Sequence, residues 1–178
     1  MGWGEVWGTH NRTNYDLSRH QEYSGKSMEY TDPEDNSKYV PYVVESSVGC
    51  DRLTLAILCN AYDEELLEDG TTREIMHFLP SIAPYKVAIL PLVKKYHSEY
   101  ARELKETLSK NFMCMYDESG SIGKRYRRED EIGTPYCITV DDETLNNNIV
   151  TIRNRDTMEQ EKINVDEIEN YISSRIKF

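Results

Sequence analysis

Sequence patterns typical of strands and of helices alternate through the second half of this 178-residue chain. This alternation constrains the fold more than any other feature of the sequence. Apolar runs predict strands over residues 86–90, 112–116 and 136–140, and the first run is apolar on both of its faces. Amphipathic patterns predict helices over 94–109 and 121–132, between these strands. The alternation indicates an α/β sheet whose first strands are parallel.

The end of the chain departs from this alternation. Residues 149–153 and 161–164 predict two short strands that pair antiparallel at the sheet edge, and 166–176 predict a closing helix. Within the helix predicted over 94–109, apolar residues recur at four-residue steps and should face the core: Tyr96, Tyr100, Leu104 and Leu108.

A second organising stretch runs from Tyr39 to Tyr62. Its first half is β-rich, it turns at Gly49, and its second half has the periodicity of a helix. This arrangement commonly builds a ligand site, because the strand end presents side chains and the helix start presents bare N–H groups.

Three residues of this stretch carry chemistry. Glu45 and Ser47 lie two apart and share one side of a strand, where a carboxylate beside a hydroxyl suits an α-ammonium group. Arg52 lies in the first turn of the helix, which is unfavourable for a cation unless an anion such as phosphate binds there. The alternative is that Glu45 and Arg52 pair with each other at a surface.

The segments around this stretch are polar. Residues 14–23 predict a short helix, and 63–74 are acidic, with little apolar periodicity. We interpret 63–74 as a solvated connection and expect a domain boundary there, which gives domains 1–72 and 73–178. Glu5 and Arg12 are polar residues in a context typical of a site, although they could also cap and pair locally.

Composition narrows the class of protein. No run of 18 apolar residues predicts a membrane span, and the first residues lack the pattern of a signal peptide. A net charge of −11 argues against non-specific binding to DNA or other nucleic acids. The four cysteines are widely spaced and resemble reduced residues of a cytoplasmic protein, without a metal site.

One basic cluster interrupts the acidic chain at Lys124–Arg128. On a helix Arg125 and Arg128 share a face, and arginine suits phosphate because its planar fork donates two hydrogen bonds. Arg153 adds a cation on the late hairpin. The alternative is a solvated helix whose charges are cancelled by the three acidic residues that follow. Candidates for reading single-stranded bases are Tyr116, Tyr136, Asn146–Asn148 and Arg153, and the sequence does not choose among them.

Three motifs resemble one known family. Val-Pro-Tyr-Val-Val-Glu-Ser-Ser-Val-Gly-Cys-Asp-Arg at 40–52 resembles motif 3 of class II aminoacyl-tRNA synthetases, in the form found in glycyl-tRNA synthetases. The stretch 2–20 resembles the segment before that motif, and 78–92 resembles the start of the family's anticodon-binding domain. The motifs agree in order and spacing over nearly the whole chain.

The resemblance implies the end of a class II antiparallel catalytic sheet, followed by an α/β anticodon-binding domain with a mixed sheet. It also implies ATP-dependent activation of glycine and its transfer to tRNA-Gly, with ATP and Mg²⁺ as cofactors and a homodimer in the full-length family. Glu45 and Ser47 match the positions that hold the glycine ammonium, and Arg52 matches the arginine that holds the γ-phosphate. Glu5 and Arg12 are implied near the adenylate. Arg125, Arg128 and Arg153 are our candidates for tRNA contacts.

Two departures from the family pattern matter. Nothing in the sequence matches motif 1, which forms much of the family's dimer interface, or motif 2, whose arginine grips the α-phosphate. We therefore expect a carboxy-terminal piece with little or no aminoacylation activity by itself. The alternative is a stand-alone tRNA-binding or regulatory module that has kept the anticodon-binding domain.

Overall fold

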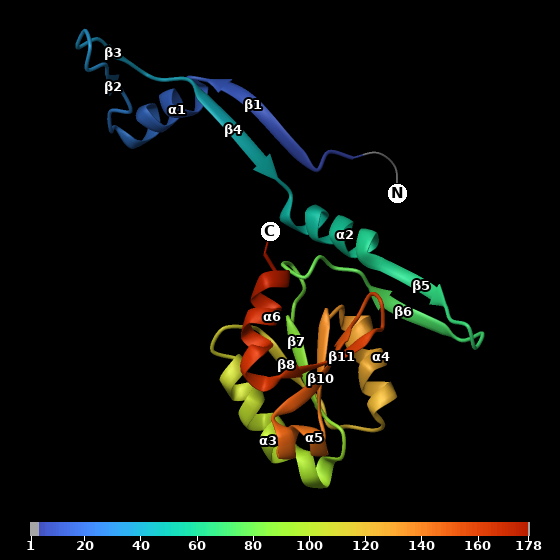
Figure 1. Cartoon of the computed structure of the whole chain (residues 1–178). Coiled ribbons are helices and arrows are strands. Elements are labelled where there is room, and N and C mark those ends of the chain that lie inside the picture. The colour runs from blue at the N-terminus through green and yellow to red at the C-terminus, as the bar shows by residue number, and fades with distance from the viewer. Residues whose placement is uncertain (1–3, 178) are drawn as a thin grey trace. The chain divides into compact units, whose positions relative to one another are not determined.

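The computed structural model describes residues 4–177, which form two compact units that meet in the chain between Ala56 and Ile57 (Figure 1). We describe each unit by itself. The predicted boundary at residue 72 falls inside a hairpin of the second unit, and the assignment of functions to 1–72 and 73–178 stays a prediction.

The first unit is built on a two-stranded antiparallel ladder. Strand β1 (Trp7–Thr13) pairs with β4 (Val43–Val48), so that His10 lies opposite Glu45. The remaining elements of this unit are α1 (Tyr15–Ser24), β2 (Tyr30–Thr31), β3 (Lys38–Tyr39) and the first half of α2 (Cys50–Ala61). This confirms the helix predicted near 14–23 and the strand that turns at Gly49 into a helix.

Little of the first unit is buried. No residue of α1 is buried, and the Trp7 side chain on β1 is 70% exposed. A two-stranded ladder gains stability mainly from what covers its faces, so this unit depends on further packing.

The second unit begins with a hairpin that the sequence did not predict. Residues 63–74 were expected to be a solvated connection, and this expectation was wrong. Strand β5 (Tyr62–Leu66) pairs with β6 (Thr72–Met76), and the side chains of Arg73 and Ile75 are buried. Buried and exposed side chains alternate in β6, but the hydropathy of the sequence does not show this because one of the two buried side chains, Arg73, is charged.

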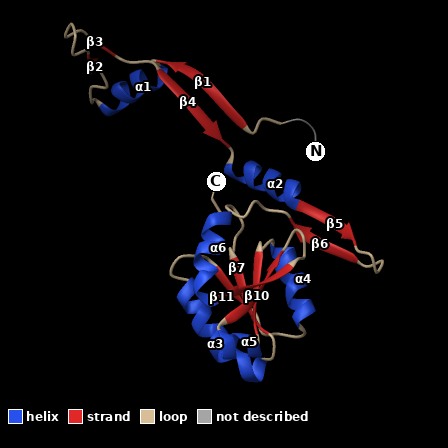
Figure 2. Cartoon of the chain, viewed as in Figure 1, coloured by secondary structure: helices blue, strands red, loops and turns tan. Residues whose placement is uncertain are grey.

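A mixed five-stranded sheet forms the centre of the second unit (Figure 2). Its strand order is β11-β10-β9-β7-β8; β8 and β9 pair parallel to β7, and β10 and β11 continue antiparallel. The bounds are β7 Val87–Pro91, β8 Cys114–Tyr116, β9 Tyr136–Val140, β10 Ile149–Asn154 and β11 Gln160–Asn164. The predicted mixed α/β sheet with a late hairpin is confirmed.

Helices cover both faces of this sheet. Helices α3 (Lys94–Leu108) and α6 (Ile168–Arg175) bury Leu104 and Ile172 against one face, and α4 (Ile122–Ile132) packs Tyr126 against the other. A short helix, α5 (Asp142–Asn147), and a 3-10 turn (Val165–Glu167) complete the unit. Every side chain of β7 is buried, as the sequence predicted for a strand covered on both faces.

The apolar stripe predicted on α3 is wrong at its start. Tyr96 is 62% exposed, and His97 lies in the core in its place. The Val93 N–H donates to His97 Nδ1 at 3.0 Å, so Nε2 donates to Asp142 at 3.1 Å. The imidazole thereby satisfies a free N–H at the helix start, which a phenol in that place would not do.

Candidate functional site

The first candidate site lies on one face of the β1–β4 ladder. Gly8 pairs with Ser47 and His10 pairs with Glu45, so these four residues share a face. Ser46 points to the opposite face, where its hydroxyl meets the Thr9 hydroxyl at 2.9 Å. This register confirms the prediction that Glu45 and Ser47 lie on the same side of a strand.

Arg12 lies on the same face, two residues after His10, at a β-bulge. The register shifts between Asn11 and Thr13, which leaves Arg12 as the extra residue of β1. Bulges re-aim side chains and occur often beside functional sites. Here the Arg12 Nε lies 3.9 Å from a Glu45 carboxylate oxygen.

Arg12 is held more closely by Asp16 of the following helix α1 than by Glu45. Its guanidinium donates to both Asp16 oxygens, at 2.8 and 2.9 Å. The hydrogen bond with Asp16 and the charges of Asp16 and Glu45 raise the pKa of Arg12, and the hydrogen bond from Arg12 lowers the pKa of Asp16. Local pairing of Arg12, one of the two interpretations of the sequence, is therefore present, and the Glu45 contact exists beside it.

Arg52 and Glu5 meet at the start of α2. One Arg52 Nη donates to the Glu5 carbonyl oxygen at 2.7 Å, and the side chain is exposed. This contact holds a cation beside the unpaired N–H groups of the first helical turn. Glu45 forms its ion pair with Arg12, so the surface pairing of Glu45 with Arg52 is not found.

Glycine at position 8 keeps this face open. A Cβ there would lie 2.4 Å from His10 Nε2 and 2.9 Å from a Glu5 carboxylate oxygen. The Glu5 carboxylate and the His10 ring therefore both approach the backbone opposite Ser47. The sequence analysis missed His10, although its position two residues before Arg12 could have placed it on this face.

The second candidate site, the basic helix α4, uses its arginines inside the fold. Arg125 is only 3% exposed and donates to the carbonyl oxygens of Pro91 and Gly120. Arg128 donates to Asp117 at 2.8 Å, and its side chain stays 41% exposed. Of the acidic residues that follow, Glu129 and Asp130 are buried. A role for these arginines in binding tRNA stays a prediction.

Arg153 belongs to a buried ion network. It donates to both Asp130 oxygens at 2.8 and 3.1 Å, and its guanidinium lies over the Tyr126 ring at 4.9 Å. Arg73 Nε lies 3.0 Å from the same carboxylate. Burial by itself would lower the pKa of Arg153, but the hydrogen bonds and charge of Asp130 outweigh it and raise that pKa. The predicted tRNA contact of Arg153 stays a prediction.

Glu129, the residue before Asp130 on α4, is buried and forms no ion pair with a described residue. Burial raises the pKa of Glu129, against the hydrogen bond that the Thr134 hydroxyl donates at 2.7 Å. Arg125, Glu129 and Asp130 therefore serve the packing of the second unit.

Comparisons with known proteins agree with this architecture. Residues 86–175 match the family described as "Anticodon binding domain". The chain is 60% identical over all 178 residues to a glycine–tRNA ligase of Clostridium beijerinckii, and 55% identical to one of Geobacillus kaustophilus. It spans 38% of the length of each of these relatives.

A solved structure shares the fold. The RNA binding domain of threonyl-tRNA synthetase from Cryptosporidium parvum superposes with a TM-score of 0.63 at 19% identity, over 83% of this chain and 35% of that one. Within residues 4–177, no helix has the length and apolar character to cross a bilayer. The matched family covers half of the chain, and the ligase relatives cover all of it. The chain therefore belongs to the anticodon-binding-domain family, in the form that glycyl-tRNA synthetases carry.

Proposed function

We propose that this chain works as part of a cytoplasmic glycine–tRNA ligase, an enzyme that joins glycine to tRNA-Gly with ATP and is a homodimer at full length. The observation that supports this proposal is the extent of the similarity. An anticodon-binding module alone would account for residues 86–175, but similarity to proteins named glycine–tRNA ligase extends through all 178 residues, including the β1–β4 ladder.

In this proposal the ladder face binds glycine. The Glu45 carboxylate accepts hydrogen bonds from the α-ammonium, and the Ser47 hydroxyl, two residues along the same strand, supplies a further partner. Arg12, 3.9 Å from Glu45, limits the negative charge of this face and fixes the position of the carboxylate. A pocket without room beyond the α-carbon excludes larger amino acids by steric contact.

The start of α2 and the residues beside it fit ATP and Mg²⁺ by their chemistry. An exposed arginine in the first turn of a helix is a suitable partner for a phosphate, and Arg52 is held there by Glu5. The Glu5 carboxylate is of the oxygen type that Mg²⁺ prefers. In the ligase, ATP would supply the phosphoric anhydride whose cleavage to pyrophosphate activates the glycine carboxylate. Arg52 would bind and orient the triphosphate, with Glu5 and Arg12 near the adenylate.

The second unit binds the anticodon arm of tRNA-Gly. Among the three predicted contact residues, Arg128 has an accessible guanidinium, whereas Arg125 and Arg153 are buried and stabilise the fold beneath the surface. Arg128→Gln is expected to weaken tRNA-Gly binding, measured by filter assay, several-fold. The control is Lys110→Gln, which removes an exposed cation in the turn after α3.

Glycine-dependent ATP–pyrophosphate exchange tests the catalytic part. The chain alone should give no exchange, and adding the remaining part of the Clostridium beijerinckii catalytic domain should restore it. Exchange by the chain alone would overturn the account of the site. tRNA binding without exchange under either condition would favour a stand-alone tRNA-binding module.

Adjacent serines provide a matched pair of variants in the restored enzyme. Ser47→Ala removes a hydroxyl from the face that carries Glu45 and should raise the KM for glycine about tenfold, the equivalent of one hydrogen bond to a charged group. Ser46→Ala removes a hydroxyl from the opposite face and should leave it within twofold. Equal effects of the two substitutions would remove the ladder face from glycine binding.

A further inference from the structure

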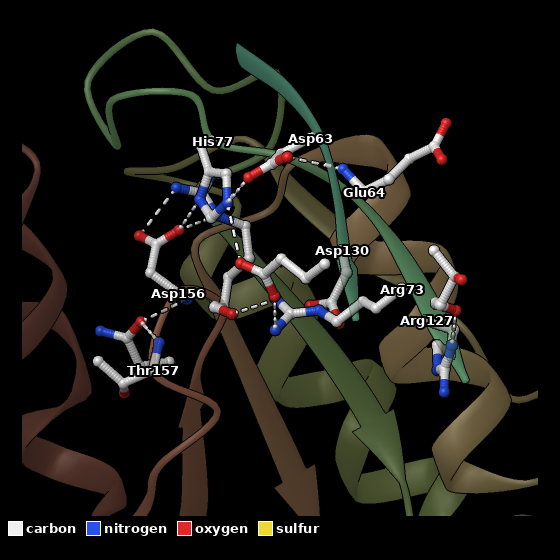
Figure 3. Close-up of polar contacts among 12 residues, drawn as sticks. Asp63, Glu64, Arg73, His77, Arg127, Asp130, Asp156 and Thr157 are labelled. Atoms are coloured by element: carbon white, nitrogen blue, oxygen red, sulfur yellow. Dashed lines mark hydrogen bonds and ion pairs between the residues drawn. The ribbon is translucent and has the colours of Figure 1, made fainter. Parts of the chain in front are cut away.

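A cluster of metal-ligating side chains lies at the end of the β5–β6 hairpin, in the second unit and apart from the residues proposed above. His77 follows β6 directly, and its ring lies among three carboxylates (Figure 3). Nε2 is 3.1 Å from Glu65 Oε1 and 4.0 Å from Asp63 Oδ2, and Nδ1 is 2.7 Å from Asp156 Oδ1.

The hydrogen bond between His77 and Asp156 determines the tautomer of the ring, and so the state of the nitrogen that faces Glu65 and Asp63. A carboxylate can only accept, so Nδ1 carries the proton and donates it to Asp156. In the neutral ring Nε2 then directs a lone pair at the Glu65 oxygen, 3.1 Å away. The Nε2 lone pair and the Glu65 oxygen thus converge on one point, where a cation can bind both.

The spacing of the donor atoms fits a metal ion. One atom each from His77, Glu65 and Asp63 lie within 4.8 Å of one another. Ligands bound to zinc at about 2.0–2.2 Å in a tetrahedron are roughly 3.3–3.6 Å apart, so small side-chain rotations suffice to close the set. Asp63 and Glu65 are two apart in β5 and share a face, and the hairpin register places Asp63 opposite Ile75, near the end of β6.

Each candidate ligand is also oriented by a second contact. The Glu64 N–H donates to Asp63 Oδ1 at 2.8 Å, and Arg73 donates to Glu65 Oε2 at 3.0 Å. Asp156 holds the His77 Nδ1–H, which is the carboxylate–histidine arrangement that supports zinc ligands. The oxygens left over, Asp63 Oδ2 and Glu65 Oε1, are the two that face His77 Nε2.

We propose that His77, Glu65 and Asp63 bind a divalent transition-metal ion, with Zn²⁺ as the expected ion and water in the open position. An imidazole nitrogen with two carboxylate oxygens is a donor set that suits Zn²⁺. The ion joins the two strands of the hairpin and, through Asp156, ties them to the turn after β10. The site is half-exposed, so the water in the open position exchanges with solvent. The bound ion supports the fold of the second unit.

The test follows the His77 ring nitrogens by long-range ¹H–¹⁵N NMR during titration of the full chain with Zn²⁺ at pH 7.5. We expect the Nε2 resonance to move to the position of a metal-bound nitrogen while Nδ1 keeps its proton. A Nε2 resonance that does not respond to Zn²⁺ would overturn the proposal. Zn²⁺ shifts confined to His10, His20 or His97 would overturn it too.

Neighbouring acids give matched variants for the same titration. Asp63→Asn changes an exposed ligand without disturbing the core and should weaken Zn²⁺ binding at least tenfold. Asp156→Asn should weaken it about 10–100-fold by loosening the ring. Glu64→Gln alters the residue between the two β5 ligands, which points away from His77, and should stay within twofold. Equal affinities for Asp63→Asn and Glu64→Gln would contradict the ligand assignment, whether or not the chain supports glycine activation.

Discussion

The two units of this chain use charged residues in opposite ways. In the first unit Arg12, Glu45 and Arg52 lie exposed on a thin ladder and at a helix start. In the second unit Arg73 and Arg153 are buried beside the shared carboxylate of Asp130, and Arg73 also pairs with Glu65. A cluster of arginines in a sequence is therefore not evidence for a binding surface, because burial decides whether the charge faces a ligand or the interior.

The largest expected effect comes from breaking the buried network. Asp130→Asn leaves two buried guanidinium groups without their shared carboxylate, and removing one partner of a buried ion pair costs about 3–5 kcal/mol. The free energy of unfolding, measured from amide exchange in β7, should fall by that amount. Glu131→Gln, the exposed neighbour, should change it by less than about 0.5 kcal/mol, and similar losses for both would contradict a buried network.

A pair of valines sharpens the contrast in packing. Val150 on β10 is fully buried, and Val44 on β4 is 69% exposed. Val150→Ala removes two buried methyl groups and should lower the unfolding free energy of the second unit by about 1.5–3 kcal/mol. Val44→Ala should change stability by less than about 0.5 kcal/mol. Denaturant titration of both variants is the measurement, and a large loss for Val44→Ala would mean that the ladder face is covered.

The smallest expected effect is on the pH dependence. Hydrogen bonds from Lys94, Tyr116 and Ser98 lower the pKa of Glu118 to about 2. The unfolded state therefore binds more protons between about pH 2 and 4.5, and the stability that Glu118 contributes is present above this window and is lost as the pH falls through it.

Glu118→Gln removes this linkage, so the acid limb of its stability curve should be shallower than that of the parent chain. Urea titrations at pH 3, 4 and 5 measure the slope. Glu106→Gln, an exposed residue of α3, is the control. A parent curve as shallow as that of Glu118→Gln would show that these hydrogen bonds do not persist in solution.

The sheet of the second unit could be predicted because its patterns are local. The uninterrupted apolar run of β7 and the periodicity of α3 depend on residues that are close in the sequence. Helix α5 was missed because it has only six residues, too few for a period, although Asp141 and Thr144 form a capping box at its start. Hairpin β5–β6 was missed because the buried position of Arg73 depends on Asp130, which lies in α4.

The candidate sites divide in the same way. That Glu45 and Ser47 share a face follows from strand periodicity, and the register of the ladder agrees with it. The contact of Arg12 with Glu45 depends on the pairing of β1 with β4, and the cluster around His77 depends on a hairpin and a distant turn. Neither arrangement has a signature in the sequence, because both arise from contacts between segments more than ten residues apart.

The parallel pairing of β7 with β9 has a consequence for how the second unit folds. Val87 lies opposite Tyr136, 49 positions later, and β7 occupies an interior place in the sheet. Ribosomes add about 5–20 residues per second, so the five buried residues of β7 emerge roughly 2–10 seconds before their main partner strand. The entropy of closing this long loop is lost before the contacts between β7 and β9 form. We therefore expect the docking of β7 with β9 to limit the folding rate, and β7 to be the segment most exposed to aggregation during synthesis.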